Sequence, residues 1–167
     1  MFGLSTPVRD AEFTEFVKSA SASLGRTAYL LTGDQDLAAD LVQEALVKTY
    51  VAWGRVRPAE APAYARRVLV NLNIDRWRRR PAVPRESVDQ VADGGETGVD
   101  DRDEVVRILA TLPEQQRRVI VLRYLEDLPE AAVAEQLGVS LGAVKSACSR
   151  GLAAIRQSHV PTIEGIL

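Results

Sequence analysis

The sequence VAEQLGVSLGAVKSACSRGLAAIRQ, residues 133–157, decides the fold because it predicts two short helices joined by a tight turn. Val133 and Leu137 are four residues apart, so they share one face of the first helix. Gly138 ends that helix, since glycine readily adopts the left-handed conformation of a helix stop. Ser140 is a favourable N-cap for the second helix. The stretch therefore predicts a helical hairpin at the least.

The second helix of this stretch is amphipathic. Its apolar stripe is expected to contain Leu141, Val144, Cys148, Leu152 and Ile155. Ser146, Ser149 and Arg150 point elsewhere, which leaves a polar face. The small Ala134 allows the two helices to cross closely, and Val144 fills the angle between them. These features favour a DNA-reading helix-turn-helix over a plain helical hairpin.

A short helix start precedes this motif, at Asp127-Leu128-Pro129, where proline suits the first helical position. Over the whole chain, 46% of the 167 residues are apolar and only 5% are aromatic, which favours an all-α protein. No stretch approaches the length of a membrane span and the N-terminus lacks a signal-peptide pattern, so the expected location is the cytoplasm.

The chemistry-bearing residue types are scarce. Cys148 is the only cysteine, His159 the only histidine and Met1 the only methionine. An internal disulfide, a zinc cluster and a histidine-based catalytic triad are therefore excluded. The sequence predicts a protein that is not an enzyme and that needs no metal or cofactor.

Charge is strongly segregated although the formal net charge is only −2. Between residues 55 and 85, Glu60 and Asp75 oppose nine arginines: Arg55, Arg57, Arg66, Arg67, Arg76, Arg78, Arg79, Arg80 and Arg85. So many like charges on a short segment repel one another unless a polyanion is near. Residues 86–104 reverse the sign, with eight acids against Arg102. This aperiodic acidic stretch predicts a disordered or extended linker between two helical domains.

The part before the linker contains three helical patterns, of which the first spans Phe13 to Leu31. Asp34 caps the second, DQDLAADLVQEALVKTYVAW. Its inward face is expected to contain Ala38, Leu41, Val42, Ala45 and Trp53, and its other side carries Asp36, Asp40, Gln43 and Val47, with Glu44 beside them. An ordinary solvated face would explain this second row equally well.

The third pattern starts at Pro62 and stops at Pro81. It combines Asn71 and Asn73 with two aromatic residues, Tyr64 and Trp77, and with many of the arginines. Asparagine can bond base edges, aromatic rings can stack on unpaired bases, and arginine grips phosphates. For Trp53 and Trp77, packing in or beside the core is favoured over base stacking.

Three stretches together carry a family resemblance: DLAADLVQEALVKTYVAW, AYARRVLVNLNIDRWRR and LPEQQRRVIVLRYLEDLPEAAVAEQLGVSLGAVKSACSR. In order and spacing they resemble the extracytoplasmic-function (group IV) sigma factors of bacterial RNA polymerase, most closely the actinobacterial SigE-like branch. The resemblance implies a sigma region 2 domain over residues 1–81, an acidic linker over 82–103, a four-helix region 4 domain over 104–157 and a tail over 158–167.

The same resemblance implies a role for individual residues. It assigns the contact with core polymerase to Asp40, Leu41, Gln43 and Glu44. Asn71 corresponds to the polar residue beside the flipped base of the minus-10 element, and Arg67, Arg76 and Arg78 to positions near the melted strand. Lys145, Ser146, Ser149 and Arg150 correspond to the helix that reads the minus-35 element. Ala147 departs from the pattern, since many members have arginine or another polar residue there.

The expected partners follow from this family. They are the clamp and flap regions of core RNA polymerase, promoter DNA and an anti-sigma factor, with no membrane insertion. The expected function is to direct the polymerase to specific promoters and to assist promoter melting. The alternative is a two-domain helix-turn-helix regulator that does not act as a sigma factor, although its N-terminal domain would be expected to contain alternating strands, and no such pattern is found.

Overall fold

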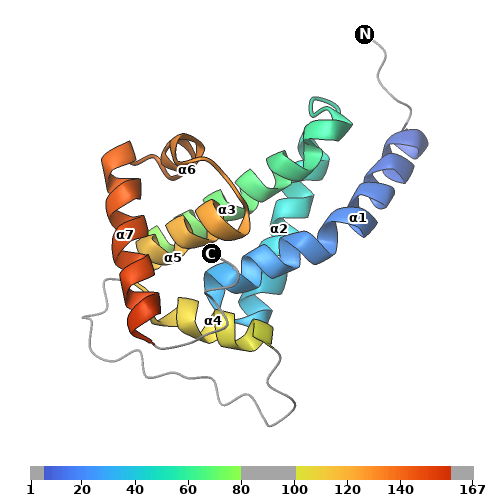
Figure 1. Ribbon diagram of the computed structural model, residues 1–167. Helices are drawn as coiled ribbons and strands as arrows, with labels where there is room; N and C mark the ends of the chain where they lie inside the picture. Colours follow the sequence, from blue (N-terminus) through green and yellow to red (C-terminus); the bar gives the residue numbers. More distant parts are fainter. Residues whose placement is uncertain (1–5, 80–100, 159–167) are drawn as a thin grey trace.

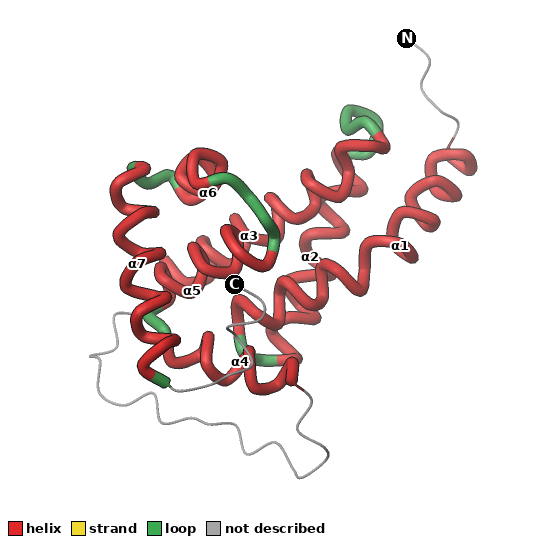
Figure 2. The backbone as a smooth tube through the Cα atoms, viewed as in Figure 1, coloured by secondary structure: helices red, strands yellow, loops and turns green. Residues whose placement is uncertain are grey.

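The computed structural model describes residues 6–79 and 101–158, and in these ranges every regular element is a helix (Figure 2). The described chain forms two lobes, residues 6–79 and residues 101–158, which we call the first and the second lobe (Figure 1). The all-α prediction is confirmed. No helix within the described ranges combines the length and the apolar character that crossing a membrane requires.

The first lobe is built from α1 (Thr6–Thr32), α2 (Gln35–Ala52), the 3₁₀ turn η1 (Pro58–Glu60) and α3 (Ala61–Arg79). α1 begins seven residues before the expected Phe13. Gly33 separates α1 from α2 with a φ of 69°, a conformation that glycine adopts without strain. The Asp34 side chain then caps α2, as predicted, by accepting a hydrogen bond of 2.9 Å from the Leu37 backbone N–H.

Apolar side chains from all three long helices fill the first lobe. Leu31, Leu41 and Leu69 are fully buried between them. At one end of the bundle, Phe13 and Trp53 meet edge to face with ring centroids 5.0 Å apart. Trp53 is therefore a core residue, as favoured from the sequence, and this packing joins α1 to the end of α2.

The second lobe contains α4 (Asp101–Thr111), α5 (Glu114–Ile120), the π-helical turn η2 (Val121–Leu125), α6 (Glu130–Leu137) and α7 (Leu141–Gln157). α4 begins at Asp101, three residues before the expected start of the second domain. Pro129 precedes α6 rather than occupying its first position. Most of the predicted linker, residues 82–100, lies outside the described residues, as does the tail from His159 onward.

The turn between α6 and α7 has the predicted helix-turn-helix chemistry. Gly138 is left-handed, with φ 64° and ψ 37°, and the Val139 N–H donates back to the Ala134 carbonyl at 3.1 Å. The Ser140 hydroxyl accepts from the Ala143 N–H at 3.1 Å and so caps α7. Val144 is fully buried at the crossing of the two helices.

The buried side of α7 differs from the predicted apolar stripe at three positions. Leu141 is 44% exposed, whereas Ala147 and Gly151 are buried along with Cys148 and Ile155. A Cβ on Gly151 would lie only 2.9 Å from Ile120 Cγ1, so α7 and α5 are in close contact there. Ala147, which departs from the family pattern, is among the buried residues of α7.

Candidate nucleic-acid interface

α7 presents a polar face to solvent. Lys145, Ser146, Ser149 and Arg150 are all exposed, and none of their side chains forms a hydrogen bond or ion pair within the part of the chain that the structure describes. On the opposite side of the helix, Val144 and Cys148 are buried. Burial raises the pKa of the Cys148 thiol, so this thiol remains a neutral core group. The four predicted residues thus share one accessible surface, the α7 face.

Leu141 was assigned to the core from the sequence, and this assignment is wrong. Because Cβ atoms tilt toward the N-terminus of a helix, a side chain in the first position projects beyond the start of the helix, where few neighbours can cover it. Its 44% exposure places an apolar group beside the α7 face. The terminal position of Leu141, directly after the cap Ser140, was the signal in the sequence that this residue would be exposed.

α3 divides its polar side chains among three directions. Arg67, Asn71 and Arg78 are exposed, and their spacings of four and seven residues put them on one side, the α3 face. These three are among the four residues expected near melted DNA; the fourth is Arg76. The last turn is rich in arginine, and positive charge is favourable at a helix C-terminus.

Arg76 faces away from these three residues, toward α2. Its Nη2 lies 3.2 Å from Glu44 Oε2, and both side chains are partly exposed. The structure therefore does not bring Arg76 together with Arg67 and Arg78. Arg76 instead links α3, the helix expected to contact DNA, with α2, the helix expected to contact polymerase.

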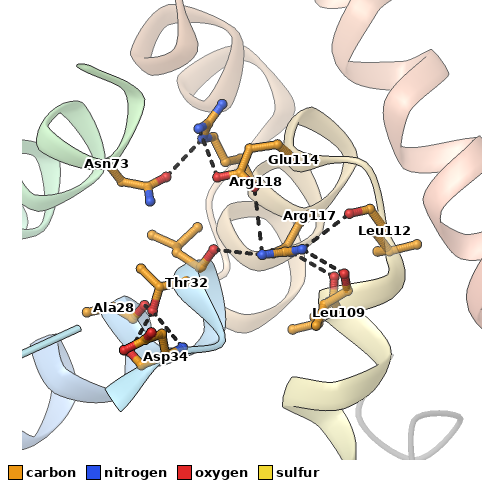
Figure 3. Close-up of polar contacts among 11 residues, drawn as sticks. Ala28, Thr32, Asp34, Asn73, Leu109, Leu112, Glu114, Arg117 and Arg118 are labelled. Atoms are coloured by element: carbon orange, nitrogen blue, oxygen red, sulfur yellow. Dashed lines mark hydrogen bonds and ion pairs between the residues drawn. The ribbon is translucent and has the colours of Figure 1, made fainter. Parts of the chain in front are cut away.

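The side chains of Asn73 and Trp77 point in a third direction, toward the second lobe. The Asn73 carboxamide is buried and accepts a hydrogen bond of 3.0 Å from Arg118 Nε (Figure 3). The Arg118 guanidinium also lies 5.2 Å from the centre of the Trp77 ring. Asn73 therefore cannot pair with a base in this arrangement, although the sequence made it as good a candidate as Asn71.

The expected polymerase contact on α2 is only partly on the surface. Asp40 and Gln43 are exposed, and Glu44 is partly exposed, pairing with Lys48 at 3.7 Å and with Arg76. Leu41 is 0% exposed and packs in the core of the first lobe, so the structure does not place it on the surface with the other three residues. The period of the helix separates Leu41 from its polar neighbours.

Two valines extend the same side of α2. Val47 is 63% and Val51 72% exposed, four residues apart, on a line with Asp40 and Gln43. Val51 was not recognised from the sequence, although continuing the spacing beyond Val47 leads to it. Asp40, Gln43, Glu44, Val47 and Val51 form what we call the α2 face.

Comparison with known proteins assigns each lobe to a known family. Residues 16–82 match the family model of Sigma-70 region 2, and residues 102–155 match that of Sigma-70, region 4. The chain is 39% identical over 150 residues to the RNA polymerase sigma-E factor of Streptomyces avermitilis, covering 87% of this chain and 84% of that relative. Identity to the sigma-E factor of Streptomyces coelicolor is 37% over 153 residues, covering 89% and 86%.

A solved structure shares the fold. The sigma factor RpoE of Bartonella quintana, in complex with the anti-sigma factor NepR, aligns with a TM-score of 0.63 at 21% identity. The alignment covers 87% of this chain and 94% of that one. At this level of identity the likeness speaks to the fold alone.

Proposed function

The chain belongs to the sigma-70 family as a sigma factor of the extracytoplasmic-function group, and on that premise we propose how its surfaces divide the work of promoter recognition. As a sigma subunit it directs RNA polymerase to promoters. The main observation behind this assignment of surfaces is the α7 face. There a capped helix-turn-helix leaves four polar side chains without partners in the described chain. The second lobe reads the minus-35 element with this face.

On the α7 face, the side chains differ in what they can read. Lys145 and Ser149 are assigned to base edges, and Arg150 to a phosphate, with Ser146 beside them. The N-terminal residues of a reading helix enter the major groove most deeply. Leu141 is the first of them, and an apolar side chain there suits a thymine methyl group.

The first lobe binds core polymerase through the α2 face and opens the minus-10 element through the α3 face. Exposed carboxylates at Asp40 and Glu44 give the contact its charge, and Val47 and Val51 supply apolar area that an obligate partner would cover. Asn71 holds an unstacked base, while Arg67 and Arg78 grip the adjoining phosphates. Extruding a base costs a few kcal/mol, which the pocket must offset.

Weak DNA contacts suffice for such a protein. Core polymerase supplies non-specific phosphate contacts and joins the two lobes into one multivalent ligand, so that each reader works at high effective concentration. This explains how a chain of net charge −2 can act on a polyanion. The protein would act in the cytoplasm, where polymerase and chromosome lie, without catalytic activity of its own, and an anti-sigma factor is a candidate partner.

The decisive experiment is transcription with purified core polymerase on a promoter selected from a random library. Wild-type protein should enable initiation, whereas Asp40→Lys should abolish co-purification with the core and leave helical content unchanged. Asp40 is preferable to Glu44 here because Glu44 also pairs with Arg76 inside the lobe. Glu12→Lys is the matched control, since it reverses an exposed acid on α1.

The alternative function, a helix-turn-helix regulator that is not a sigma factor, predicts the opposite result. A helix-turn-helix regulator would bind its DNA without core polymerase, and the polymerase would not depend on it to initiate. Undiminished co-purification of Asp40→Lys would remove the α2 face from the polymerase contact.

A further inference from the structure

Arg76 lies on α3 but belongs neither to the α3 face nor to the α2 face. It continues the row of Ala65, Leu69 and Leu72 at spacings of four, three and four residues, and these three side chains are buried in the first lobe. Since α2 and α3 pack side by side, this row directs Arg76 toward α2 (Figure 1). The Arg76 side chain is 33% exposed, so it reaches the edge of this helix packing.

The arginines of the α3 face lie on a different side of the same helix. Successive residues of an α-helix are rotated by about 100°, so Arg76 and Arg78 are separated by about 200°. Arg67 and Arg78 are exposed, and neither side chain has a hydrogen bond or ion pair within the described chain. A DNA strand that lies along the α3 face would therefore contact these two arginines and have Arg76 on the far side of the helix.

The position of Arg76 in the last turn of α3 does not explain its direction. Three arginines lie in that turn, Arg76, Arg78 and Arg79, and each is favourable near the C-terminus of a helix. Among these three, Arg76 alone has an ion-pair partner within residues 6–79 and 101–158. The specific feature of Arg76 is thus its partner on α2.

This partner is a carboxylate of the α2 face. Arg76 Nη2 donates to Glu44 Oε2 at 3.2 Å, and the other oxygen, Glu44 Oε1, lies 3.7 Å from Lys48 Nζ. Glu44 precedes Lys48 by four residues, which is the favourable order for such a pair within a helix. Two cations from different helices thus hold one carboxylate and restrict the rotation of the Glu44 side chain.

The pair of Arg76 and Glu44 adds little to the stability of the first lobe. The side chains are 33% and 42% exposed, and exposed ion pairs contribute little in water. A partner that covers the α2 face would exclude water from the pair, and opposite charges attract more strongly where water is excluded. A carboxylate covered without its cation would be unfavourable. The pair therefore matters most when the α2 face is bound.

We propose that Arg76 is a positioning residue of the polymerase contact, which orients and neutralises Glu44 when core polymerase covers the α2 face, and that it does not grip melted DNA. The inference rests on the proposed function, in which the α2 face binds polymerase. Asp40 is exposed and has no ion pair within the described chain, so it acts on the polymerase directly. Arg76 acts through Glu44.

Equilibrium binding of the full-length protein to purified core polymerase, without DNA, measures this role. Arg76→Met keeps the length of the side chain and removes its charge. It should weaken the affinity for core about five-fold, because the Glu44 side chain must then be ordered on binding. Arg76→Lys should recover most of this loss, since Arg76 pairs through one nitrogen and an ammonium group can replace it. Circular dichroism should show the same helical content in both variants.

A double substitution tests whether Arg76 acts through Glu44. Glu44→Ala alone should weaken binding to core, because it removes a carboxylate of the α2 face. In protein that already carries Glu44→Ala, Arg76→Met should cause no further loss, since the group that it holds is gone. An equal loss in both backgrounds would overturn the inference, because Arg76 would then act independently of Glu44.

Open-complex formation separates Arg76 from the arginines of the α3 face. Arg78→Met is the matched control, because it makes the same change two residues further along α3, on the exposed side. It should leave the affinity for core unchanged and reduce the salt dependence of log affinity for promoter DNA by about one unit. Arg76→Met should not change this salt dependence, and its open-complex yield should equal that of the wild type once core polymerase is saturated with the variant.

The remaining outcomes distinguish this inference from the proposed function. If Arg76→Met bound core as tightly as the wild type and reduced the salt dependence as Arg78→Met does, Arg76 would belong to the DNA contact and the inference would be wrong. A loss with Arg76→Lys as large as with Arg76→Met would also overturn it, because the charge would then have no effect. Failure of the wild-type protein to bind core polymerase would contradict the proposed function itself.

Discussion

The two helices proposed to read promoter DNA, α3 and α7, differ in how many of their polar side chains are already bound within the protein. The four polar residues of the α7 face are exposed and have no partner in the described chain. On α3, Asn73 and Arg66 bond to the second lobe and Arg76 bonds to α2, which leaves a narrower face for DNA.

This difference reflects what surrounds each helix. α7 packs on α5 and α6 along one side only, so its buried residues are all apolar or small and its polar residues are all exposed. α3 contacts α1 and α2 within its own lobe and also the second lobe. A helix with neighbours on several sides uses its polar residues structurally as well as functionally, and residue type alone then does not reveal the role.

The largest expected effect comes from the inward side of α7. Gly151→Val would force a branched side chain against Ile120, where even a Cβ would lie at 2.9 Å. We expect the free energy of unfolding of the second lobe to fall by about 3 kcal/mol, as for overpacked cores. Urea unfolding followed by circular dichroism measures this.

Ala153→Val is the control for Gly151→Val, because it places the same branched residue on the exposed side of α7. Its cost should be limited to a few tenths of a kcal/mol from helix propensity. Equal destabilisation by both substitutions would mean that α7 is not divided into a packed side and a free side.

A smaller effect distinguishes the two asparagines of α3. Asn71→Ala should leave stability and closed-complex formation nearly unchanged and lower the open-complex yield about ten-fold, since the base loses part of its pocket. Asn73→Ala should instead weaken the contact between lobes, because it removes the acceptor of Arg118. Permanganate footprinting of promoter DNA and unfolding by urea separate the two results.

The distinction between the two asparagines would not hold if both substitutions had the same effect. A matching loss of melting in Asn71→Ala and Asn73→Ala would indicate that both act through the structure of the first lobe. It would also remove the reason for treating the α3 face as distinct from the side of α3 that contacts the second lobe.

The smallest expected effect concerns the chemistry of the α7 face. If Arg150 grips a phosphate, Arg150→Ala should weaken binding to all minus-35 sequences alike and reduce the salt dependence of log affinity by about one unit. Ser149→Ala should instead relax preference at one base position, at about 1 kcal/mol. Transcription from a randomised promoter library at several salt concentrations distinguishes these roles.

Unchanged selectivity after substitution of Lys145, Ser149 and Arg150 in turn would mean that α7 does not read the minus-35 element. Relaxed preference at one position in Arg150→Ala would instead assign that arginine to a base.

The features predicted most reliably from the sequence are the helix caps and ends, which local interactions determine. Asp34, Gly138 and Ser140 cap or end their helices as expected, because these interactions involve residues only a few positions apart. The period of the helix also predicted the polar side of α7 correctly. The error at Leu141 arose at a helix end, where the period continues but the covering neighbours do not.

Contacts between the lobes were not predictable from the same patterns. Asn71 and Asn73 are two residues apart in the same kind of sequence, yet one is exposed and the other bonds to Arg118. Leu41 shows the converse, because a family resemblance included it in a surface contact although the helical period had placed it inside. Which side of a helix faces a distant segment depends on the tertiary fold.

The contacts between the two lobes join residues far apart in the sequence, and this separation has a consequence for the order of folding. Thr27 and Glu126 are 99 residues apart, and Arg66 and Glu126 are 60 apart. The first lobe packs through contacts within residues 6–79, so it can fold on the ribosome before α5 has been synthesised. Pairing of distant residues carries the loop-closure entropy of the intervening chain and comes late. Each newly synthesised molecule therefore passes through a stage in which the first lobe is folded and its contacts with the second lobe have not yet formed.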